Sequence, residues 1–470
     1  MVNKIYCGDC LFIMRHDLLE RGIKVDLIYL DPPFFTGKIQ KSNWQPGAME
    51  VSFEDSKKFW GTKGIIGAPT WLKELGVKRP AFASYLNYIG KRLELCKRVL
   101  KDSGSIYLHC DNRAAHYLKM IMDNIFGYKN LINEIIWQRS LGHHLAAKMD
   151  VMTDSLFFYT KNKDFVYNQQ YQKLSDKELD KKFSQIEEET GRKFTHRQLE
   201  QPQNIGSRGE TRIIQGKKIK TEQGWRWSQK RIDEKLAENP YIVYWTSTGR
   251  PRYKLYADEY KGRKLGSLWT DIPHLSSGSK ERRGFPTQKP EALLERVIKI
   301  SSNPGDLVLD PFCGCGTAIV AANKLNRNWI GIDINPDACE VMTKRFEDYF
   351  QITPELHLRN VEEIKKLNPS QFEIWVNEFY QARKPSPDRG VDGITPEGWP
   401  IQTKTFKVKY DVVSSFLNNI KYHPSVPQPA KYAIIASKEG FAESAMARVF
   451  QIKENEGITI KLVTPEDLLE

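Results

Sequence analysis

The residues best suited to do chemistry in this sequence are Asp31-Pro32-Pro33-Phe34, which follow the apolar run Val25–Leu30. The two prolines fix the backbone and remove two N–H donors, so the motif offers a carboxylate, carbonyl acceptors and an aromatic face. An exocyclic amine of a nucleobase needs such acceptors, because its lone pair is delocalised into the ring. The ring of Phe34 can stack on a base turned out of its helix. A plain turn after a buried strand is the alternative interpretation.

A second motif, Asp310-Pro-Phe-Cys-Gly-Cys-Gly-Thr317, stands between an apolar run and the helix-forming segment Ala318–Ala322. Its glycines let the backbone approach a ligand closely, and the helix N-terminus offers free N–H donors. Asp333 ends the next apolar run 23 residues after Asp310, where a carboxylate can bind ribose hydroxyls. Ile319 stands where a dinucleotide-binding loop has its third glycine. An adenosine cofactor without a pyrophosphate therefore fits better, with a simple tight turn as the alternative.

The elements that must position these motifs follow an α/β pattern. Four apolar runs end in acidic or glycine-rich loops, namely Val25–Leu30, Ser105–Leu108, Asp306–Leu309 and Trp329–Ile332. Helical stretches such as 290–298 alternate with them. Near-continuous apolar strands occur in sheets that are covered on both faces, and ligands bind at their carboxyl ends. We therefore predict a doubly wound α/β domain with its site at the strand ends.

The middle of the chain has a different composition and pattern. Residues 161–279 are rich in Lys, Gln, Glu and aromatic side chains, and they lack the α/β alternation. Residues 141–280 hold 26 Lys and Arg against 18 Asp and Glu, in a chain of net charge +13. A basic, aromatic segment favours a polyanionic partner, with nucleic acid first, although a solvated charged surface has the same composition.

Length and composition exclude several classes of protein. The 470 residues suggest two or three domains, and a hydrophobic content of 40% is enough to build their cores. No apolar run is long enough to span a bilayer, and the N-terminus becomes polar too soon for a signal peptide. We expect a soluble cytoplasmic protein with no membrane partner. The seven scattered cysteines favour free thiols, with zinc bound by the pairs Cys7–Cys10 and Cys313–Cys315 as a weaker alternative.

Together these motifs resemble those of the β-group amino DNA methyltransferases, which methylate adenine N6 or cytosine N4 with S-adenosyl-L-methionine. The resemblance covers roughly residues 1–350. Asp31–Phe34 stands for the catalytic [DNS]-P-P-[YFW] motif, and the 310–317 loop stands for the F-x-G-x-G cofactor loop. Thr287–Pro290 and Gly8-Asp9 match two further segments, and the catalytic motif precedes the cofactor motif, as in the β group.

The resemblance implies a role for individual residues. The target base would be held by Asp31, Pro32, Pro33 and Phe34. The cofactor would be bound by Asp9, Lys289, Asp310, Phe312, Gly314, Gly316, Thr317 and Asp333. An aspartate at the first motif position favours adenine N6, with cytosine N4 left open. Asp111, which follows another strand end, could also reach this cleft; His143 and His144 suggest a loop or DNA-backbone role rather than a metal site.

The resemblance also implies an architecture. A Rossmann-like class I methyltransferase would be formed by residues 1–160 and 280–352, and residues 161–279 would be an inserted target-recognition region. Double-stranded DNA would be the partner. Members of the family are often homodimers, and no surface signal in the sequence decides the oligomeric state.

The C-terminal block, residues 365–470, carries a separate pattern. Asp392 is followed ten residues later by Gln402-Thr403-Lys404, with a hairpin expected between them and Glu373 on a preceding helix. An acid and a lysine at one sheet edge can hold a divalent metal beside a phosphodiester. This pattern resembles the Mrr-like branch of the PD-(D/E)xK restriction endonucleases, a smaller α/β fold, with Q-x-K in place of E-x-K. The resemblance implies Mg²⁺ held by Asp392 and Gln402; an inactive nuclease fold and an unrelated α/β domain are the alternatives.

The combined expectation is a site-specific DNA adenine-N6 methyltransferase with a fused nuclease-like domain, acting in restriction-modification or DNA defence. A DNA-binding regulatory protein with an inert methyltransferase core is the alternative from another class. The intact Asp31–Phe34 motif and both loop glycines argue against it. RNA or protein substrates are disfavoured by the large basic insertion.

Overall fold

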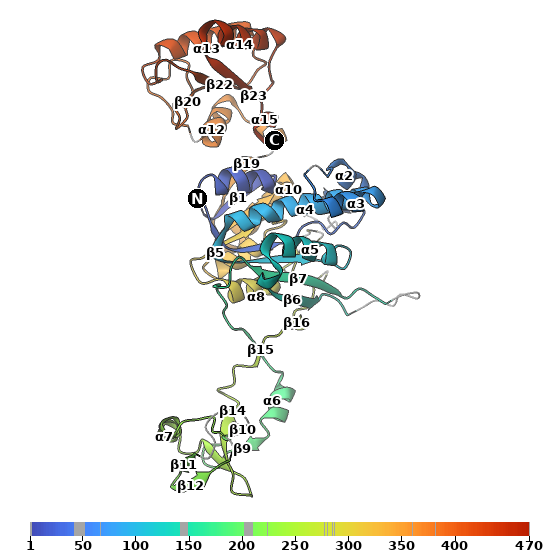
Figure 1. Cartoon of the computed structure of the whole chain (residues 1–470), viewed down its shortest axis with the longest axis vertical. Helices are drawn as coiled ribbons and strands as arrows, with labels where there is room; N and C mark the ends of the chain where they lie inside the picture. The colour runs from blue at the N-terminus through green and yellow to red at the C-terminus, as the bar shows by residue number, and fades with distance from the viewer. Residues whose placement is uncertain are drawn as a thin grey trace. The chain divides into compact units, whose positions relative to one another are not determined.

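The computed structural model describes residues 2–41, 52–65, 67–141, 149–201, 210–222, 224–276, 278–279, 281–283, 285, 287–359, 361–380 and 382–469. The chain divides into two compact units (Figure 1). Met1–Asn168 and Ser267–Glu470 form the first unit, and Gln169–Gly266 forms the second. His143 and His144 lie outside the described residues.

A nine-stranded sheet organises the first unit. In sheet order the strands are β16 (Leu268–Trp269), β6 (Leu131–Gln138), β7 (Thr153–Thr160), β5 (Leu100–Cys110), β2 (Val25–Leu30), β17 (Leu307–Asp310), β18 (Asn328–Asp333), β1 (Lys4–Gly8) and β19 (Glu355–Arg359). The six strands from β5 to β19 are parallel, whereas β7 is antiparallel to both of its neighbours. The sheet is therefore mixed.

The order of the strands brings distant parts of the sequence together. β17 comes late in the chain but lies between β2 and β18, with Leu309 in register with Ile28. Because parallel strands end at the same edge of a sheet, the loops after β1, β2, β17 and β18 share that edge. The two motifs that the sequence separates by about 280 residues are thus neighbours.

Helices cover both faces of this sheet, as predicted. On one face, α1 (Cys10–Ile13), the π-helical turn η1 (Met14–Leu19), α4 (Pro80–Val99) and α5 (Ala115–Phe126) share a core with Ile28, Leu30, Ile106 and Leu108. The alternating side chains point to the other face, where α8 (Glu291–Ser301), α9 (Thr317–Lys324) and α10 (Pro336–Phe350) pack. There the ring centres of Trp329 of β18 and Phe346 of α10 lie 4.4 Å apart, with the rings tilted by 42°, and the hydroxyl of Tyr107 of β5 lies 2.7 Å from that of Ser301 of α8.

Shorter elements complete this part of the unit. They are β3 (Ile39–Lys41), β4 (Ser52–Glu54), α2 (Lys57–Thr62), α3 (Thr70–Lys78) and η2 (Tyr128–Asn130). The sheet extends further along the chain than the expected end at residue 352, because β19 pairs with β1. β19 is an edge strand with an exposed, mixed sequence, ELHLR, so it lacks the apolar run that marks the other strands.

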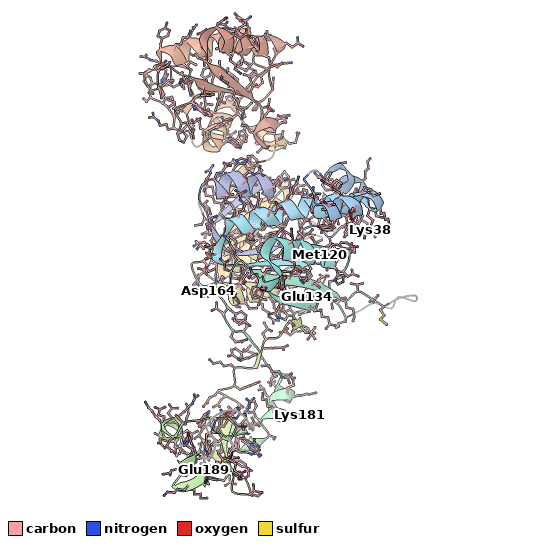
Figure 2. All side chains as sticks on the ribbon, in the orientation of Figure 1. Lys38, Met120, Glu134, Asp164, Lys181 and Glu189 are labelled. Carbon is pink, nitrogen blue, oxygen red and sulfur yellow. The ribbon has the colours of Figure 1, made fainter. Side chains whose placement is uncertain are left out.

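The second unit has its own small core. An antiparallel sheet has the order β13 (Val243–Trp245), β14 (Pro251–Tyr256), β10 (Lys193–Gln198) and β9 (Gln185–Ile186). It is joined by the hairpin of β11 (Thr211–Ile214) and β12 (Lys217–Lys220), the pair β8 (Tyr171–Gln172) and β15 (Arg263–Lys264), and the helices α6 (Asp176–Lys182) and α7 (Gln229–Glu238). Its core includes Phe194, Trp225 and Tyr256. Figure 2 labels two of its exposed side chains, Lys181 and Glu189.

The C-terminal part of the first unit builds a second α/β sheet, of order β20 (Gly393–Ile394), β21 (Pro400–Lys404), β22 (Tyr432–Ser437) and β23 (Thr459–Val463). β20 and β21 form the expected hairpin, and β22 is central, parallel to β21 and β23. The helices are α11 (Val361–Lys366), α12 (Pro369–Phe379), α13 (Tyr410–Tyr422), α14 (Glu443–Glu456) and α15 (Pro465–Leu469). None of the helices described is long and apolar enough to cross a membrane.

Candidate active site

A cavity of about 330 Å³ lies at the carboxyl edge of the large sheet. The strand ends of β1, β2, β17 and β18 contribute one carboxylate each, from Asp9, Asp31, Asp310 and Asp333. Of the residues predicted from the sequence, the cavity is lined by Asp9, Asp31, Pro32, Pro33, Phe34, Lys289, Asp310, Phe312, Gly314, Thr317 and Asp333. The fold therefore brings the two motifs to one cavity.

Gly316 is the predicted residue that does not line the cavity, and its contribution is to the shape of the loop. It precedes α9 with a φ of +80°, and a Cβ there would lie 2.8 Å from Met342 Cγ. Gly314 has a φ of +53°, and its Cβ would lie 2.9 Å from the ring of Phe285. Only glycine fits such left-handed positions without strain. The two glycines thus allow the tight path of the cofactor loop.

Asp333 ties the end of β18 to that loop. One of its carboxylate oxygens accepts a hydrogen bond from Gly314 N at 2.8 Å, and the other accepts one from Asn335 N at 2.9 Å. Burial raises the pKa of Asp333 to about 6, although these hydrogen bonds oppose the rise. Each oxygen has a second lone pair, so the carboxylate can still accept from a ligand.

The other two carboxylates of the predicted cofactor site differ in environment. Asp310 is buried, and burial, with the charges of Asp31 and Asp333, raises its pKa well above the usual value although Phe312 N donates to it. Asp9 instead accepts from Leu11 N at 2.7 Å and from Arg92 at 2.5 Å. These contacts fix the position of the Asp9 side chain at the end of β1.

Asp31 forms an ion pair with the ammonium of Lys289, which also lies 4.9 Å from the ring centre of Phe34. The resemblance assigns Lys289 to the cofactor, but its ion pair in this structure is with the predicted base-holding carboxylate. The second oxygen of Asp31, Oδ1, is buried and has no hydrogen-bond partner. An unsatisfied buried carboxylate oxygen at a cavity is an acceptor ready for a donor from a ligand.

The acid–base composition of the cavity indicates the charge of its ligand. Its lining includes the carboxylates of Asp9, Asp31, Asp55, Asp310 and Asp333, against the ammonium groups of Lys63 and Lys289. An excess of anionic groups in a partly closed cavity attracts a cationic ligand. The sulfonium and ammonium groups of S-adenosylmethionine meet this requirement, so the residues present fit that cofactor.

Sequence reasoning missed two buried polar groups at this site. Asp55 is fully buried and accepts from Thr36 N, Thr36 Oγ1 and Trp60 Nε1 at 2.6–2.7 Å, which fixes the chain beside the Asp31–Phe34 motif. His109, also fully buried, lies 4.0 Å from Asp31 Oδ1. The sequence offers a signal for His109, which lies at the end of an apolar run. It offers no such signal for Asp55.

Asp111, the other strand-end acid considered from the sequence, is not among the residues that line the cavity. It accepts a hydrogen bond from Arg113 N at 3.0 Å and forms an ion pair with the Arg113 side chain at 2.9 Å. Its contacts are those of a turn between β5 and α5.

The predicted nuclease residues gather at the β20–β21 hairpin of the C-terminal sheet. Asp392 accepts from Thr403 N at 2.6 Å, and Gln402 Nε2 donates to Gly390 O at 3.0 Å, which leaves the buried Gln402 Oε1 without a partner. Burial raises the pKa of Asp392; the Thr403 hydrogen bonds and the charge of Lys404 oppose this, and Glu373 adds to it. Glu373 itself forms an ion pair with Lys384 at 2.6 Å.

Metal binding at this hairpin would need further ligands. Among the described residues, no group of three or more His, Cys, Asp and Glu side chains is arranged to hold a metal ion. The fitting donors are the carboxylate of Asp392 and the unpartnered oxygen of Gln402. Mg²⁺ commonly keeps several waters and binds through one or two protein oxygens plus a phosphate, which is compatible with this small set.

A family model described as DNA methylase, covering N6 and N4 methyltransferases, matches residues 25–344, and the chain belongs to this family. It is 29% identical over 331 residues to the type II methyltransferase M.EcaI of Enterobacter cloacae, covering 70% of this chain and 66% of that protein. It is 26% identical over 335 residues to the StyLTI Mod subunit, part of a type III restriction-modification enzyme of Salmonella typhimurium.

That second match covers 69% of this chain and 50% of the Mod subunit. A shorter match, 45% identical over 89 residues, is to the DNA adenine methyltransferase YhdJ of Escherichia coli, covering 19% of this chain and 30% of YhdJ. The chain thus spans between about one third and two thirds of the length of these relatives.

Proposed function

We propose that this chain transfers a methyl group from S-adenosyl-L-methionine to adenine N6 at a specific site in double-stranded DNA, in restriction-modification or DNA defence. One observation carries the proposal: Asp31 Oδ1 is a buried, unpartnered acceptor in the cavity that the 310–317 loop and Asp333 also line. The family and the relatives with restriction-modification names support it. The name of YhdJ and the aspartate at position 31 favour adenine over cytosine N4.

The residues of the cavity would bind two ligands, the cofactor and the target base. Asp333, Asp310 and Asp9, with the backbone at Gly314, would hold the cofactor, which supplies an electrophilic methyl on a sulfonium. Asp31 Oδ1 accepts a hydrogen bond from the amine and so raises the electron density on its nitrogen. Phe34 stacks on the base, and Pro32 and Pro33 keep the motif rigid. Positioning and electrostatics are the contributions of the protein.

The test is the variant Asp31→Ala, assayed with methyl-labelled cofactor on unmodified genomic DNA that is then digested to nucleosides. We expect the wild type to place the label in N6-methyladenine. The variant should lose activity by roughly 10³-fold or more and bind the cofactor nearly as well, because Asp31 contacts the base. Asp111→Asn serves as the matched control, because Asp111 follows β5, which neighbours β2 in the sheet, but does not line the cavity.

Three outcomes would change the proposal. Label in N4-methylcytosine would keep the mechanism and change the base. Retained activity in Asp31→Ala would refute the base-holding role. Cofactor binding without any labelled DNA would point to RNA or a missing partner, and a wild type that does not bind the cofactor would favour an inert scaffold.

We further propose that the C-terminal sheet is an Mg²⁺-dependent endonuclease domain of the Mrr-like type. The supporting observation is the buried Gln402 Oε1, which has no hydrogen-bond partner, on the strand whose neighbouring residue Ile401 pairs with Gly393, next to Asp392. Asp392 and Gln402 would hold the ion, which supplies polarisation of a phosphodiester, and Lys404 would neutralise charge that develops on the phosphate. Glu373 is close enough to influence Asp392 electrostatically.

The test is Lys404→Ala, with Lys407→Ala as the matched control, because Lys407 is an exposed lysine of the same segment. We expect the wild type to fragment DNA only with Mg²⁺, Lys404→Ala to lose this cleavage and keep methylation, and Lys407→Ala to keep both. Cleavage that persists in Lys404→Ala would place any nuclease activity elsewhere, and a wild type that never cleaves would favour an inactive nuclease fold.

A further inference from the structure

A buried polar chain lies behind Asp31, on three neighbouring strands. The hydroxyl of Tyr29, on β2, is 2.8 Å from His109 Nδ1, on β5. His109 Nε2 is 3.2 Å from Asp154 Oδ2, on β7. The exposed fractions of these three side chains are 2%, 0% and 4%, so water does not compete for their hydrogen bonds.

The hydrogen bonds define how the imidazole of His109 is oriented. Burial opposes ionisation of Asp154, yet the hydrogen bond from His109 and the charges of His109, Lys289 and Arg139 hold the pKa of Asp154 below its usual value. Asp154 is therefore a carboxylate that accepts the Nε2 proton. In neutral His109 this leaves a lone pair on Nδ1, which accepts from Tyr29.

The same nitrogen atom lies near the carboxylate of Asp31. His109 Nδ1 lies 4.0 Å from Asp31 Oδ1, the carboxylate oxygen that has no hydrogen-bond partner. The other oxygen of Asp31 is occupied by Lys289. A buried carboxylate oxygen without a donor is costly unless a proton arrives during function.

Neighbouring aromatic and charged side chains fix the position of the His109 imidazole. Its ring meets the edge of Trp137, with 5.8 Å between the ring centres, and lies 5.6 Å from the ring of Phe34. Trp137 is itself fixed by a hydrogen bond from its indole nitrogen to Ile272 O at 2.8 Å, and Arg139 lies 2.9 Å from the second oxygen of Asp154. A carboxylate and an imidazole buried between strands cost stability that apolar residues would not.

We propose that His109 and Asp154 are positioning residues that complete the proton acceptor of the methyl transfer. The amine nitrogen forms the new N–C bond with its lone pair, while the S–C bond breaks and its electron pair stays on sulfur. The nitrogen then carries the positive charge and releases one N–H proton to Asp31 Oδ1. The Tyr29 hydroxyl then turns away from His109 Nδ1, whose freed lone pair takes the proton on from Asp31, and the carboxylate of Asp154 stabilises the positive charge that results.

This inference rests on the proposed function, and the experiment separates the two. The variants are His109→Gln, which keeps a donor to Asp154 but cannot hold a proton, and Asp154→Asn, which keeps the shape of the side chain and removes its charge. Tyr107→Phe is the matched control, because Tyr107 is another buried side chain of β5 with one hydrogen bond, to Ser301. The readout is the single-turnover rate of DNA methylation, with cofactor and DNA affinities measured separately.

We expect His109→Gln and Asp154→Asn to lose about 10²-fold in single-turnover rate, as is typical for loss of a proton acceptor, with both affinities within about twofold of wild type. The loss should shrink as pH rises, because solvent base replaces the missing acceptor. Tyr107→Phe should methylate at the wild-type rate. Should the two variants fail to fold, Tyr29→Phe removes only the hydroxyl beside Nδ1 and should alter the pH dependence of the rate.

Wild-type rates in His109→Gln and Asp154→Asn would overturn the inference, as would an unchanged pH profile in Tyr29→Phe. So would a loss that appears equally in Tyr107→Phe, which would indicate a structural role alone. If the wild type methylates DNA and Asp31→Ala does not, these outcomes leave the proposed function intact. A wild type that fails to methylate DNA removes the proposed function, and this inference with it.

Discussion

The carboxylates at the edge of the large sheet have the same chemical group and different surroundings. Asp333 receives two backbone hydrogen bonds, Asp310 receives one and is buried beside two other acids, and Asp31 has a lysine on one oxygen and no partner on the other. The first two suit a ligand group that is held in place. The third suits a donor that arrives and leaves, as an amine does during transfer of its proton.

At this scale we predict that cofactor affinity falls as the pH drops through about 6. Burial gives Asp333 a pKa of about 6, so the acid becomes protonated below that value and accepts hydrogen bonds from a ribose less well. The loss should approach tenfold per pH unit. Calorimetry between about pH 5 and pH 8 measures it, on protein whose circular dichroism shows it to be folded.

The variant Asp333→Asn provides the control for this pH effect. Its amide does not titrate, so cofactor binding should be weaker at neutral pH and nearly independent of pH. A wild-type affinity that stays constant through pH 6 would contradict the role given to Asp333, and an equal pH dependence in the variant would assign the effect to another group.

Among the elements, the short loop between β17 and α9 lines the part of the cavity that we propose for the cofactor. Its path depends on two left-handed glycines, one packed under Phe285 and one against Met342. The loop is thus fixed from outside by a residue before α8 and by a residue of α10. Such a loop presents its backbone to a ligand with little reorganisation, which lowers the entropic cost of binding.

We predict that Gly314→Ala weakens cofactor binding by about tenfold or more and lowers the free energy of unfolding by about 1–3 kcal/mol. A methyl group there would meet Phe285 and force a φ of +53° on a residue with a side chain. Gly305→Ala is the matched control, because its φ is +88° but its Cβ would have no atom within 4 Å. Calorimetric titration and denaturant unfolding measure the two effects.

Gly305→Ala should lose stability through backbone strain and keep wild-type cofactor affinity. Equal losses of affinity in both variants would mean that general destabilisation, rather than the shape of the loop, weakens binding.

At the scale of the whole molecule, the compact unit Gln169–Gly266 lies between the two halves of the large sheet in sequence. It holds 22 Lys and Arg against 14 Asp and Glu. The difference between these two counts equals the basic excess of the whole 141–280 segment. Its β11–β12 hairpin exposes Lys217, Lys218 and Lys220. A basic unit with its own core is suited to contact DNA, and we propose that it recognises the target sequence.

We predict that removing this unit separates cofactor binding from DNA binding. Gln172 and Arg263 are paired in the β8–β15 ladder, so a Gly-Ser turn of about four residues can replace residues 173–262. The shortened protein should bind the cofactor with wild-type affinity and lose most specific DNA affinity. The triple variant Lys217→Ala, Lys218→Ala, Lys220→Ala should bind DNA more weakly, and its salt dependence of binding should fall by about 0.9 for each phosphate that is no longer neutralised.

Specific DNA binding retained by the shortened protein would refute target recognition by this unit. Loss of cofactor binding would instead mean that the unit supports the fold of the large sheet. Unchanged salt dependence in the triple variant would mean that the protein binds phosphates away from the β11–β12 hairpin.

Short stretches of the sequence are enough to predict many local features of this protein. Apolar runs define β2, β5, β17 and β18 of the large sheet. The Asp31–Phe34 motif and the Gly314 loop have fixed backbone requirements, and the composition of the 161–279 segment separates it from the α/β pattern. The hairpin of the C-terminal sheet was also predictable. These features depend on residues that are close together in the sequence, so a single amino-acid sequence is enough to predict them.

Which of these elements lie side by side depends on the fold of the whole domain. Strand order places β17 beside β2, although Asp31 and Asp310 are far apart in the sequence. The pairing of His109 with Asp154 requires β5 and β7 to be neighbours, and the ion pair of Lys289 with Asp31 requires the segment before α8 to reach the edge of β2. Local sequence patterns do not specify such contacts. The contacts depend on the order of the strands in the sheet and on which polar side chains are buried away from water.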